Sequence, residues 1–274
     1  MLLPQRIAEW LKARRFRNIF DRFRKSDFPE SPVFERLIVP GDTVLDIGAN
    51  IGVVAKLLKE LTGPAGMVHS YEPVPYTFRI LRDNIIRIGA TNVTCHPFAI
   101  SDSDGTATIE IPTFAETPSK KSVNSGSFGR LRNYYGAFLT RDNALTSNHD
   151  RYVVETRSID SLFSTGSERI SFIKCDAEGF EFECMLGAKA LLERDHPALF
   201  IELCSDPEEE GTPTWNMTDF LAGFGYSPYL FEGGILQPRQ RGSSARLPSL
   251  HDVDYFYLTL EHYQKATVGS HVRL

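Results

Sequence analysis

A short apolar run that ends in an acid and a glycine turn constrains this chain most. Residues 43–47 are rich in β-branched side chains, the turn Gly48-Ala49-Asn50-Ile51-Gly52 follows, and apolar residues then recur at helical spacing from Val53. This order predicts a strand, a tight turn and a helix. Glycines let backbone N–H groups approach a ligand closely, and the first N–H groups of a helix attract an anionic group. We therefore expect a ligand to bind at this turn.

A second strand signal narrows the class of ligand. Residues 67–71 form the next apolar run, and Glu72 follows them at the place where a carboxylate can accept hydrogen bonds from both hydroxyls of a ribose. The dinucleotide fingerprint needs glycines at positions 50 and 53, but these are Asn50 and Val53, so a pyrophosphate is poorly served.

S-adenosylmethionine (SAM) matches this pattern because it carries a ribose but no phosphate. We expect Asp46 to face its cationic end, the helix start to face its carboxylate and Glu72 to face its ribose. Another nucleotide, or a strand-turn-helix unit without a ligand, is the alternative interpretation of these residues.

Strands that alternate with helices predict the α/β class. Beyond the first two strands, helical or strand patterns follow one another to residue 260, which is typical of a mostly parallel sheet covered on both faces. Such sheets bind ligands beyond the carboxyl ends of their strands. The further strands are expected at 92–100, 106–111, 152–156, 170–176, 198–203, 226–231 and 253–260, and the helices at 76–88, from 159, from 177 to 192, and at 215–223.

The N-terminal segment is basic and amphipathic. Residues 1–25 hold eight Lys or Arg residues against Glu9 and Asp21, with apolar residues at roughly helical spacing. One interpretation is a helix that packs its aromatic face on the core and leaves its arginines in solvent. The other is a helix that lies on an anionic membrane or docks a partner. We assign residues 1–34 to a helical extension.

An insertion of nearly forty residues interrupts the domain at about 112–150. It is rich in Ser, Asn, Gly, Lys and Arg and carries scattered aromatic residues, which disfavour disorder. Long loops inside compact domains are usually functional. We expect a lid or a substrate-binding insertion, with a merely decorative loop as the alternative.

Composition excludes several other classes. The four cysteines form no C-x-x-C pair, so they predict reduced thiols of a cytoplasmic protein rather than a disulfide framework or a zinc site. The start of the chain has no apolar leader region, and no run is long enough to span a membrane. A net charge of −5 argues against nucleic acid as a partner.

With these residues in view, the chain resembles the FkbM-type family of SAM-dependent methyltransferases from about residue 35 to 260. The I-K-x-D-x-E-G-x-E run at residues 173–181 is specific to that family, although Ala177 replaces its usual valine. The other matching segments are Val44 to Gly52 (VLDIGANIG), Tyr71-Glu72-Pro73, Ala99-Ile100-Ser101-Asp102, Asn124-Ser125-Gly126 and Arg157-Ser158-Ile159-Asp160-Ser161-Leu162.

The resemblance implies a Rossmann-like class I methyltransferase fold, with seven mostly parallel strands and an antiparallel last strand. It implies a methyltransferase domain over residues 35–265, a tail over 266–274, and methyl transfer to a hydroxyl of a sugar, glycan precursor or secondary metabolite. Ala99 and Ile100 then border the adenine, unless their role is structural. The cofactor residues it implies are Asp46, Gly48, Asn50, Gly52, Glu72, Ala99 and Ile100.

Three carboxylates are the candidates for the chemistry. Asp176 and Glu202 end neighbouring strands and Glu178 follows closely, so we expect them beside the reacting methyl group. A general base that takes the proton of an alcohol acceptor is typically worth about 10²–10⁴-fold in rate. The alternatives are that Asp176 or Glu178 caps the following helix, and that the carboxylates bind Mg²⁺.

Two functions of other classes compete with the methyltransferase. One is a SAM-fold protein that has lost its chemistry and acts as a binding or scaffold subunit, although the cofactor motifs are intact. The other is a nicotinamide-dependent oxidoreductase, which the missing glycines disfavour. The identity of the acceptor and the oligomeric state do not follow from the sequence.

Overall fold

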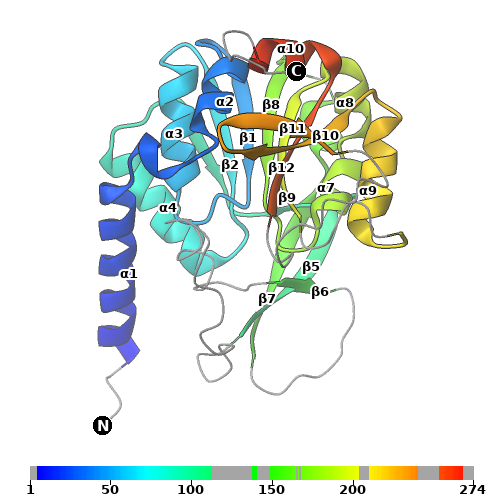
Figure 1. Ribbon diagram of the computed structural model, residues 1–274. Coiled ribbons are helices and arrows are strands. Elements are labelled where there is room, and N and C mark those ends of the chain that lie inside the picture. Colours follow the sequence, from blue (N-terminus) through cyan, green and yellow to red (C-terminus); the bar gives the residue numbers. More distant parts are fainter. Residues whose placement is uncertain are drawn as a thin grey trace.

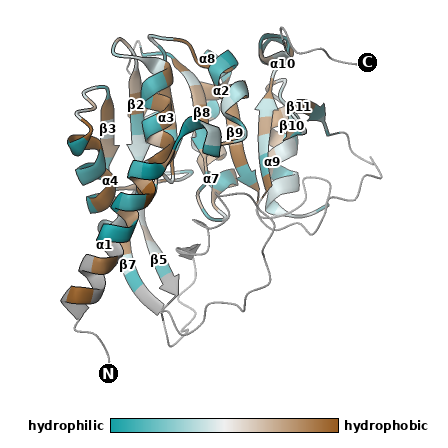
Figure 2. Ribbon diagram, turned by 60° about the vertical axis from the view of Figure 1, so that its left-hand side comes forward, coloured by the Kyte–Doolittle hydropathy of each residue, from teal (hydrophilic) through white to brown (hydrophobic). Residues whose placement is uncertain are grey.

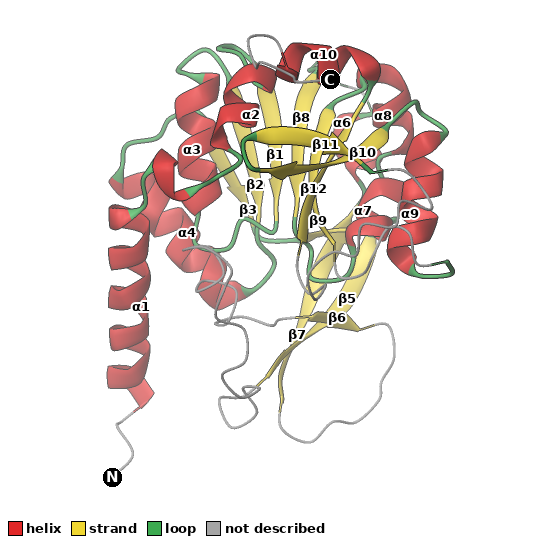
Figure 3. Ribbon diagram, viewed as in Figure 1, coloured by secondary structure: helices red, strands yellow, loops and turns green. Residues whose placement is uncertain are grey.

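The computed structural model describes two β-sheets and the helices packed around them (Figures 1 and 3). The described residues are 5–112, 138–140, 149–164, 166, 168–203, 210–239 and 253–267. Within this part of the chain, none of the helices combines the length and the apolar character needed to cross a lipid bilayer.

The main sheet has the expected parallel centre and one strand more than expected. Its order is β11-β10-β12-β9-β8-β1-β2-β3. Strand β12, the last in the sequence, runs antiparallel to β9, as predicted, and the extra edge strand β11 pairs antiparallel with β10. The bounds are β1 (Thr43–Ile47), β2 (Met67–Tyr71), β3 (Val93–His96), β8 (Ile170–Cys175), β9 (Ala198–Leu203), β10 (Ser227–Glu232), β11 (Ile235–Pro238) and β12 (Val253–Leu258).

Helices cover both faces of the main sheet, because alternate strand residues point to opposite sides. Val44, Phe172 and Phe200 belong to one buried cluster, while Leu45 and Ile173 belong to the other. The helices on the first face are α2 (Ser31–Leu37), α3 (Val53–Thr62) and α10 (Leu260–Thr267). Those on the second face are α6 (Ile159–Phe163), α7 (Glu181–Leu186), α8 (Lys189–Asp195) and α9 (Pro213–Ala222). Helix α4 (Pro75–Arg87) packs beside α3.

A second sheet corrects the prediction of one strand over residues 92–100. Only β3 joins the main sheet, and β4 (Ala99–Ile100) leaves it to pair with β7 (His149–Arg157). Proline lacks a backbone N–H, so Pro97 interrupts the strand between the two. The four strands follow the order β4-β7-β5-β6, where β5 is Gly105–Pro112 and β6 is Phe138–Thr140.

The insertion therefore connects strands of this second sheet. Strand β5 pairs antiparallel with β7 along its whole length, from Gly105 to Pro112. Residues 113–137 and 141–148 lie outside the described residues, so the lid prediction is untested there. In Figure 1 strands β5, β6 and β7 of the second sheet lie below the strands of the main sheet.

The helix expected from 177 to 192 is two helices with a break at Gly187. A Cβ built on Gly187 would lie 2.0 Å from the Ser101 carbonyl oxygen, so the chain passes too close to Ser101 for any side chain. The Gly187 carbonyl accepts a hydrogen bond from Asp160 N. The first helix begins at Glu181, several residues later than predicted.

The N-terminal helix α1 (Gln5–Arg22) has two differently placed halves. Phe16 and Phe20 near its end are buried, whereas Ile7 and Leu11 are 45% and 44% exposed. Its first turns extend past the helices around the main sheet, and hydrophilic and hydrophobic residues alternate along it (Figure 2). Phe34, which we placed in the extension, packs on Phe172 inside the core.

Candidate active site

The turn after β1 is shaped by the end of β8. Gly48 has φ +69°, and a Cβ on it would lie 1.8 Å from the carbonyl oxygen of Asp176. The same two strands are joined there by a hydrogen bond from Asp176 N to the Ile47 carbonyl. Glycine at 48 is therefore required by contact between two backbones, and this contact sets the floor of the site.

Gly52 has a packing role instead of a ligand-facing one. It is the N-cap of α3 with φ +90°, and a Cβ there would lie 2.7 Å from Leu81 Cδ1 of α4. It lines neither of the two pockets described below. The structure thus separates Gly48, at the pocket wall, from Gly52, between packed helices.

Glu72 is a buried carboxylate held by backbone donors. Its side chain is 6% exposed, Oε2 accepts from Asn50 N at 3.0 Å, and Oε1 accepts from Val74 N at 2.9 Å. Burial raises the pKa of Glu72 to about 7, against the opposing effect of these two hydrogen bonds. A carboxylate oxygen has lone pairs for more than one donor, so both oxygens retain capacity for ligand hydroxyls.

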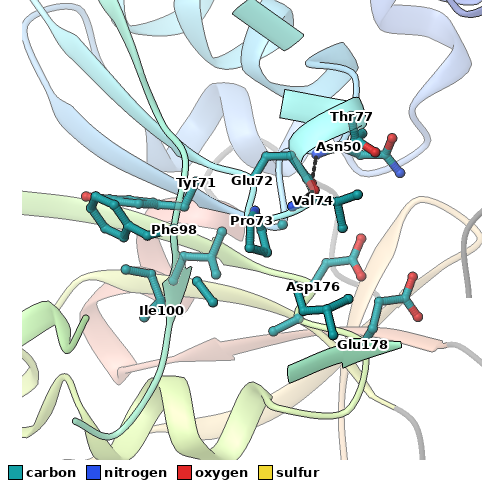
Figure 4. A pocket seen from close by; sticks show the side chains of 15 residues that line it. Asn50, Tyr71, Glu72, Pro73, Val74, Thr77, Phe98, Ile100, Asp176 and Glu178 are labelled. Atoms are coloured by element: carbon teal, nitrogen blue, oxygen red, sulfur yellow. Dashed lines mark hydrogen bonds between the residues drawn. The ribbon is translucent and has the colours of Figure 1, made fainter. Parts of the chain in front are cut away.

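A pocket opens beside Glu72 at the carboxyl ends of β1 and β2 (Figure 4). Its empty space, which includes open solvent at its mouth, is about 700 Å³. Its polar part is formed by Asn50, Glu72, Thr77, Asp176 and Glu178. The apolar and aromatic part comprises Ile47, Tyr71, Pro73, Val74, Phe98, Ala99, Ile100, Ile109 and Ala177, and Gly48 completes the wall.

This first pocket fits SAM on its own chemistry. The buried carboxylate Glu72 suits a ribose, and the aromatic and aliphatic wall around Phe98 and Ile100 suits an adenine. The close approach of Gly48 to β8 leaves backbone, rather than a side chain, at the turn. Because these residues converge on one space, we take the first pocket as the cofactor site.

A second pocket of similar size lies on the other side of the same turn. It shares Gly48, Asn50, Asp176 and Glu178 with the first pocket. Its other described lining residues are Phe28, Ala49, Ile51, Val53, Val54, Lys174, Phe200, Glu202 and Asp254. Asp176 and Glu178 therefore stand where the two spaces meet, and Glu202 belongs to the second space alone.

Lys174 contacts both backbone carbonyls and carboxylates at this junction. Its side chain is 7% exposed, and Nζ donates to the carbonyls of Ile47 at 3.0 Å and Gly48 at 2.9 Å. Nζ also lies 3.3 Å from Asp176 Oδ2 and 3.7 Å from Asp46 Oδ1. Burial alone would lower the pKa of Lys174, but the nearby carboxylates outweigh it and hold that pKa above its ordinary value.

The position of Asp46 differs from our expectation. Its side chain is fully buried beneath the turn and lines neither pocket, so its carboxylate faces Lys174 and not the cationic end of a ligand. The reason is strand geometry: Asp46 and Lys174 are register partners on β1 and β8, so their side chains share one face of the sheet. Burial raises the pKa of Asp46 to about 6.

The loop after β8 is fixed by a carboxylate to which the sequence analysis gave no role. Glu181 accepts hydrogen bonds from Ala177 N at 2.8 Å and from Gly179 N at 3.1 Å. The loop carries Glu178 in a left-handed conformation, φ +52°, which is uncommon for a residue other than glycine and concentrates at functional sites. Phe180, not Asp176 or Glu178, is the N-cap of α7.

The structure therefore brings most of the predicted site residues together. Gly48, Asn50, Glu72, Ala99 and Ile100 line the first pocket, with Asp176 and Glu178 at its junction with the second. Within the described part of the chain, no three His, Cys, Asp or Glu side chains form a group able to hold a metal ion. The Mg²⁺ alternative therefore gains no support from these residues.

Sequence reasoning missed the roles of Lys174, Tyr71 and Phe98. Lys174 was visible only as one letter of the family-specific run, because the carbonyls it binds lie more than 120 residues earlier in the chain. Tyr71 and Phe98 were absorbed into strand patterns. In the structure Tyr71 stacks on His96 with ring centroids 4.7 Å apart, and it contacts Phe98 at 5.5 Å.

The main sheet and its helices form a Rossmann-like α/β fold with a pocket at the carboxyl ends of its parallel strands. The "Methyltransferase FkbM domain" family model matches residues 46–228, about two thirds of the chain. The chain belongs to the FkbM methyltransferase family.

Curated relatives match over short segments. The 31-O-demethyl-FK506 methyltransferase FkbM of Streptomyces tacrolimicus is 48% identical over 48 residues, 18% of each chain. A protein-L-isoaspartate O-methyltransferase of Methanococcoides burtonii is 39% identical over 57 residues, 21% of this chain and 28% of that protein. The matches thus span less than a third of either relative. The solved structure of methyltransferase FkbM from Methylobacillus flagellatus KT gives a TM-score of 0.46 at 16% identity, over 84% of this chain and 50% of that one.

Proposed function

We propose that this protein transfers the methyl group of SAM to a hydroxyl of a sugar, glycan precursor or secondary metabolite. The observation that carries the proposal is the meeting of two pockets at Asp176 and Glu178. One pocket has the residues for the cofactor, and the other offers a separate space for an acceptor. Methyl transfer needs both partners aligned in line across one short gap, and this junction supplies such a gap.

Each wall of the proposed cofactor pocket has a proposed role. Glu72 would accept from the ribose, and Phe98, Ala99 and Ile100 would border the adenine. The backbone of the turn at Gly48 and Asn50 would face the amino-acid end. When bound, SAM supplies an electrophilic methyl group on a sulfonium.

Asp176 is our candidate for the general base. Its side chain is 34% exposed and borders both pockets, so it can reach an acceptor hydroxyl at the junction. The carboxylate would accept the hydroxyl proton as the oxygen–carbon bond forms and the methyl–sulfur bond breaks, its electron pair staying on the sulfur of a neutral thioether product. Asp176 would then be neutral until the proton passes to solvent. Glu178 at the same junction and Glu202 deeper in the second pocket would then orient the acceptor.

The class of acceptor is supported by the second pocket and by one relative. Phe28 and Phe200 give it an apolar surface beside carboxylates, a combination that suits a polyhydroxylated or polyketide-like molecule. The name of the Streptomyces relative states methylation at an oxygen. We propose the cytoplasm as the compartment, where the buried unpaired thiols of Cys175 and Cys184 would stay reduced.

The direct test is methyl transfer from radiolabelled SAM to a panel of sugars, glycan precursors and polyketide-like alcohols. We expect label in a product that survives as a methyl ether. Saturable SAM binding without transfer to any compound would favour the inactive scaffold. A thermal shift with NAD but not with SAM would favour the oxidoreductase and contradict the proposal.

A further inference from the structure

Lys174 connects three parts of the site that are far apart in the sequence. Its ammonium group binds the carbonyls of Ile47 and Gly48, where β1 becomes the cofactor turn. It also lies 3.3 Å from the Asp176 carboxylate at the end of β8. One buried cation thus touches both the backbone of the cofactor turn and the candidate base.

The geometry of the turn shows why such a contact is needed. Gly48 is in a left-handed conformation, and its missing Cβ lets it lie directly against the Asp176 carbonyl. A residue in that conformation returns readily to other backbone regions unless its neighbours hold it. The two hydrogen bonds from Nζ to the carbonyls of residues 47 and 48 fix the peptide groups on either side of the bend.

The burial of Lys174 also indicates a specific role. Removing an ammonium from water is costly unless it is paired and hydrogen-bonded, and hydrophobic residues of similar size are often at least as stable in such places. Asp46 balances part of the charge, but it is 3.7 Å away and contacts neither pocket. A purely structural ion pair would not need to end at the wall of a ligand site.

We propose that Lys174 is a positioning residue that locks the cofactor turn and the Asp176 carboxylate into one arrangement. The turn is then held for SAM before it binds, and Asp176 is kept oriented toward the acceptor. The part about SAM stands on the cofactor site alone. The part about Asp176 rests on the proposed function.

The test uses double variants, because Lys174→Met alone would leave Asp46 buried beside no cation. Asp46→Asn with Lys174→Met removes both charges, and Asp46→Asn with Lys174→Gln keeps N–H donors for the two carbonyls. Lys189→Met, an exposed lysine at the start of α8, is the matched control. Thermal melts establish folding, and calorimetry measures SAM affinity without an acceptor.

We expect the Met double variant to bind SAM at least tenfold more weakly, the Gln double variant to be intermediate, and Lys189→Met to match the wild type. A folded Met double variant within twofold of wild-type SAM affinity would overturn the locking of the turn. Equal affinities of the Met and Gln double variants would overturn the role of the carbonyl hydrogen bonds.

Turnover tests the second part separately. Lys174 favours the ionised form of the Asp176 carboxylate and Asp46 disfavours it, so the effect of Lys174 is measured against Asp46→Asn alone. The acidic limb of the kcat–pH profile should lie at higher pH in the Met double variant than in Asp46→Asn. An unchanged limb would overturn the link to Asp176. If the wild type methylates no acceptor, the proposed function fails, while the calorimetry still decides the role of Lys174 at the turn.

Discussion

Single backbone positions control this site more than single side chains do. Gly48 is the clearest case, because its φ of +69° and its contact with the Asp176 carbonyl both exclude a Cβ. Gly41 also has a positive φ, +97°, but nothing lies within 4 Å of the position of its Cβ. A comparison of Gly48 with Gly41 therefore separates the free-energy cost of a strained backbone conformation from the cost of a steric clash.

We expect Gly48→Ala to lower the free energy of unfolding by about 2–5 kcal/mol, since backbone strain and overpacking add. Gly41→Ala should cost about 1–2 kcal/mol, from conformation alone. Denaturant unfolding of both variants measures the difference. Equal losses of unfolding free energy would mean that the turn moves away from β8 at no cost. That result would contradict the role given to the contact between Gly48 and the Asp176 carbonyl.

Glu72 gives a pH-dependent prediction. Burial raises its pKa from an ordinary 4.5 to about 7, so the folded protein keeps a proton that the unfolded chain has lost. Its contribution to stability is therefore fully present below about pH 4.5 and is lost as the pH rises through 7. Glutamine mimics the protonated form, so the melting temperature of Glu72→Gln relative to the wild type should rise between about pH 5 and about pH 8.

The affinity for SAM should follow the opposite trend in the wild type, because the ionised carboxylate is the better acceptor for ribose hydroxyls. At about pH 8 we expect Glu72→Gln to bind SAM more weakly by about 1–3 kcal/mol, the scale of a charge-assisted hydrogen bond. Calorimetry at about pH 5 and at about pH 8 measures the SAM affinity of the variant and of the wild type. Identical affinities of a folded variant and the wild type at about pH 8 would remove Glu72 from the cofactor site.

At the scale of elements, α1 combines features of both interpretations of the basic segment. Phe20 is fully buried. The centroid of its ring lies 5.3 Å from Lys56 Nζ and 5.7 Å from Arg87 Cζ. Arg87 also pairs with Asp21 at 2.7 Å. The end of the helix is thus tied to α3 and α4, while Ile7 and Leu11 near its start are exposed.

We expect Phe20→Ala to lower the free energy of unfolding by about 3–5 kcal/mol, as for other large aromatic residues in cores. Leu11→Ala should change it by less than about 1 kcal/mol, since that side chain is 44% exposed. Chemical denaturation compares the two. Co-sedimentation with vesicles that contain anionic lipid then tests the membrane interpretation, which predicts binding that Leu11→Asp weakens.

Most elements of the main sheet could be predicted. The exceptions depend on features that a periodic pattern of apolar residues does not show. Strand β2 has the predicted bounds because its apolar period and its flanking turns are local signals. Pro97 was a local signal for the departure of β4 from the main sheet. The break between α7 and α8 at Gly187 depends instead on backbones that meet only in the fold. Sequence periodicity contains no information about such contacts. The second sheet was missed for the same reason.

The candidate site was predicted to a similar extent. Glu72 and Asp176 follow strand ends, and strand ends gather at one edge of a parallel sheet, so their placement could be deduced. The burial of Asp46 beside Lys174 was not foreseen, because it depends on the register of β1 against β8. Its role toward the cofactor stays a prediction. Lys174 was missed because its partners are main-chain carbonyls, which no residue type reveals.

The whole molecule brings two pockets, the proposed cofactor and acceptor spaces, to one edge of the main sheet, with Asp176 lining both. This arrangement makes Asp176 the centre of the proposed chemistry. A residue that only capped a helix would affect stability, and a residue that anchored the cofactor would affect SAM affinity. A base or an acceptor-holding group affects turnover but not SAM affinity, so the three roles separate when turnover, SAM affinity and stability are all measured for one variant.

The most direct measurement is therefore the turnover of Asp176→Asn on its acceptor, together with its SAM affinity and melting temperature. Asparagine keeps the shape of the side chain and removes the negative charge that takes or orients the proton. We predict a fall in kcat of about 10²-fold or more, the scale of general-base assistance, with SAM affinity close to wild type. The melting temperature should fall, because buried Lys174 loses the charge of its nearest carboxylate partner. Wild-type turnover by the folded variant would contradict the account.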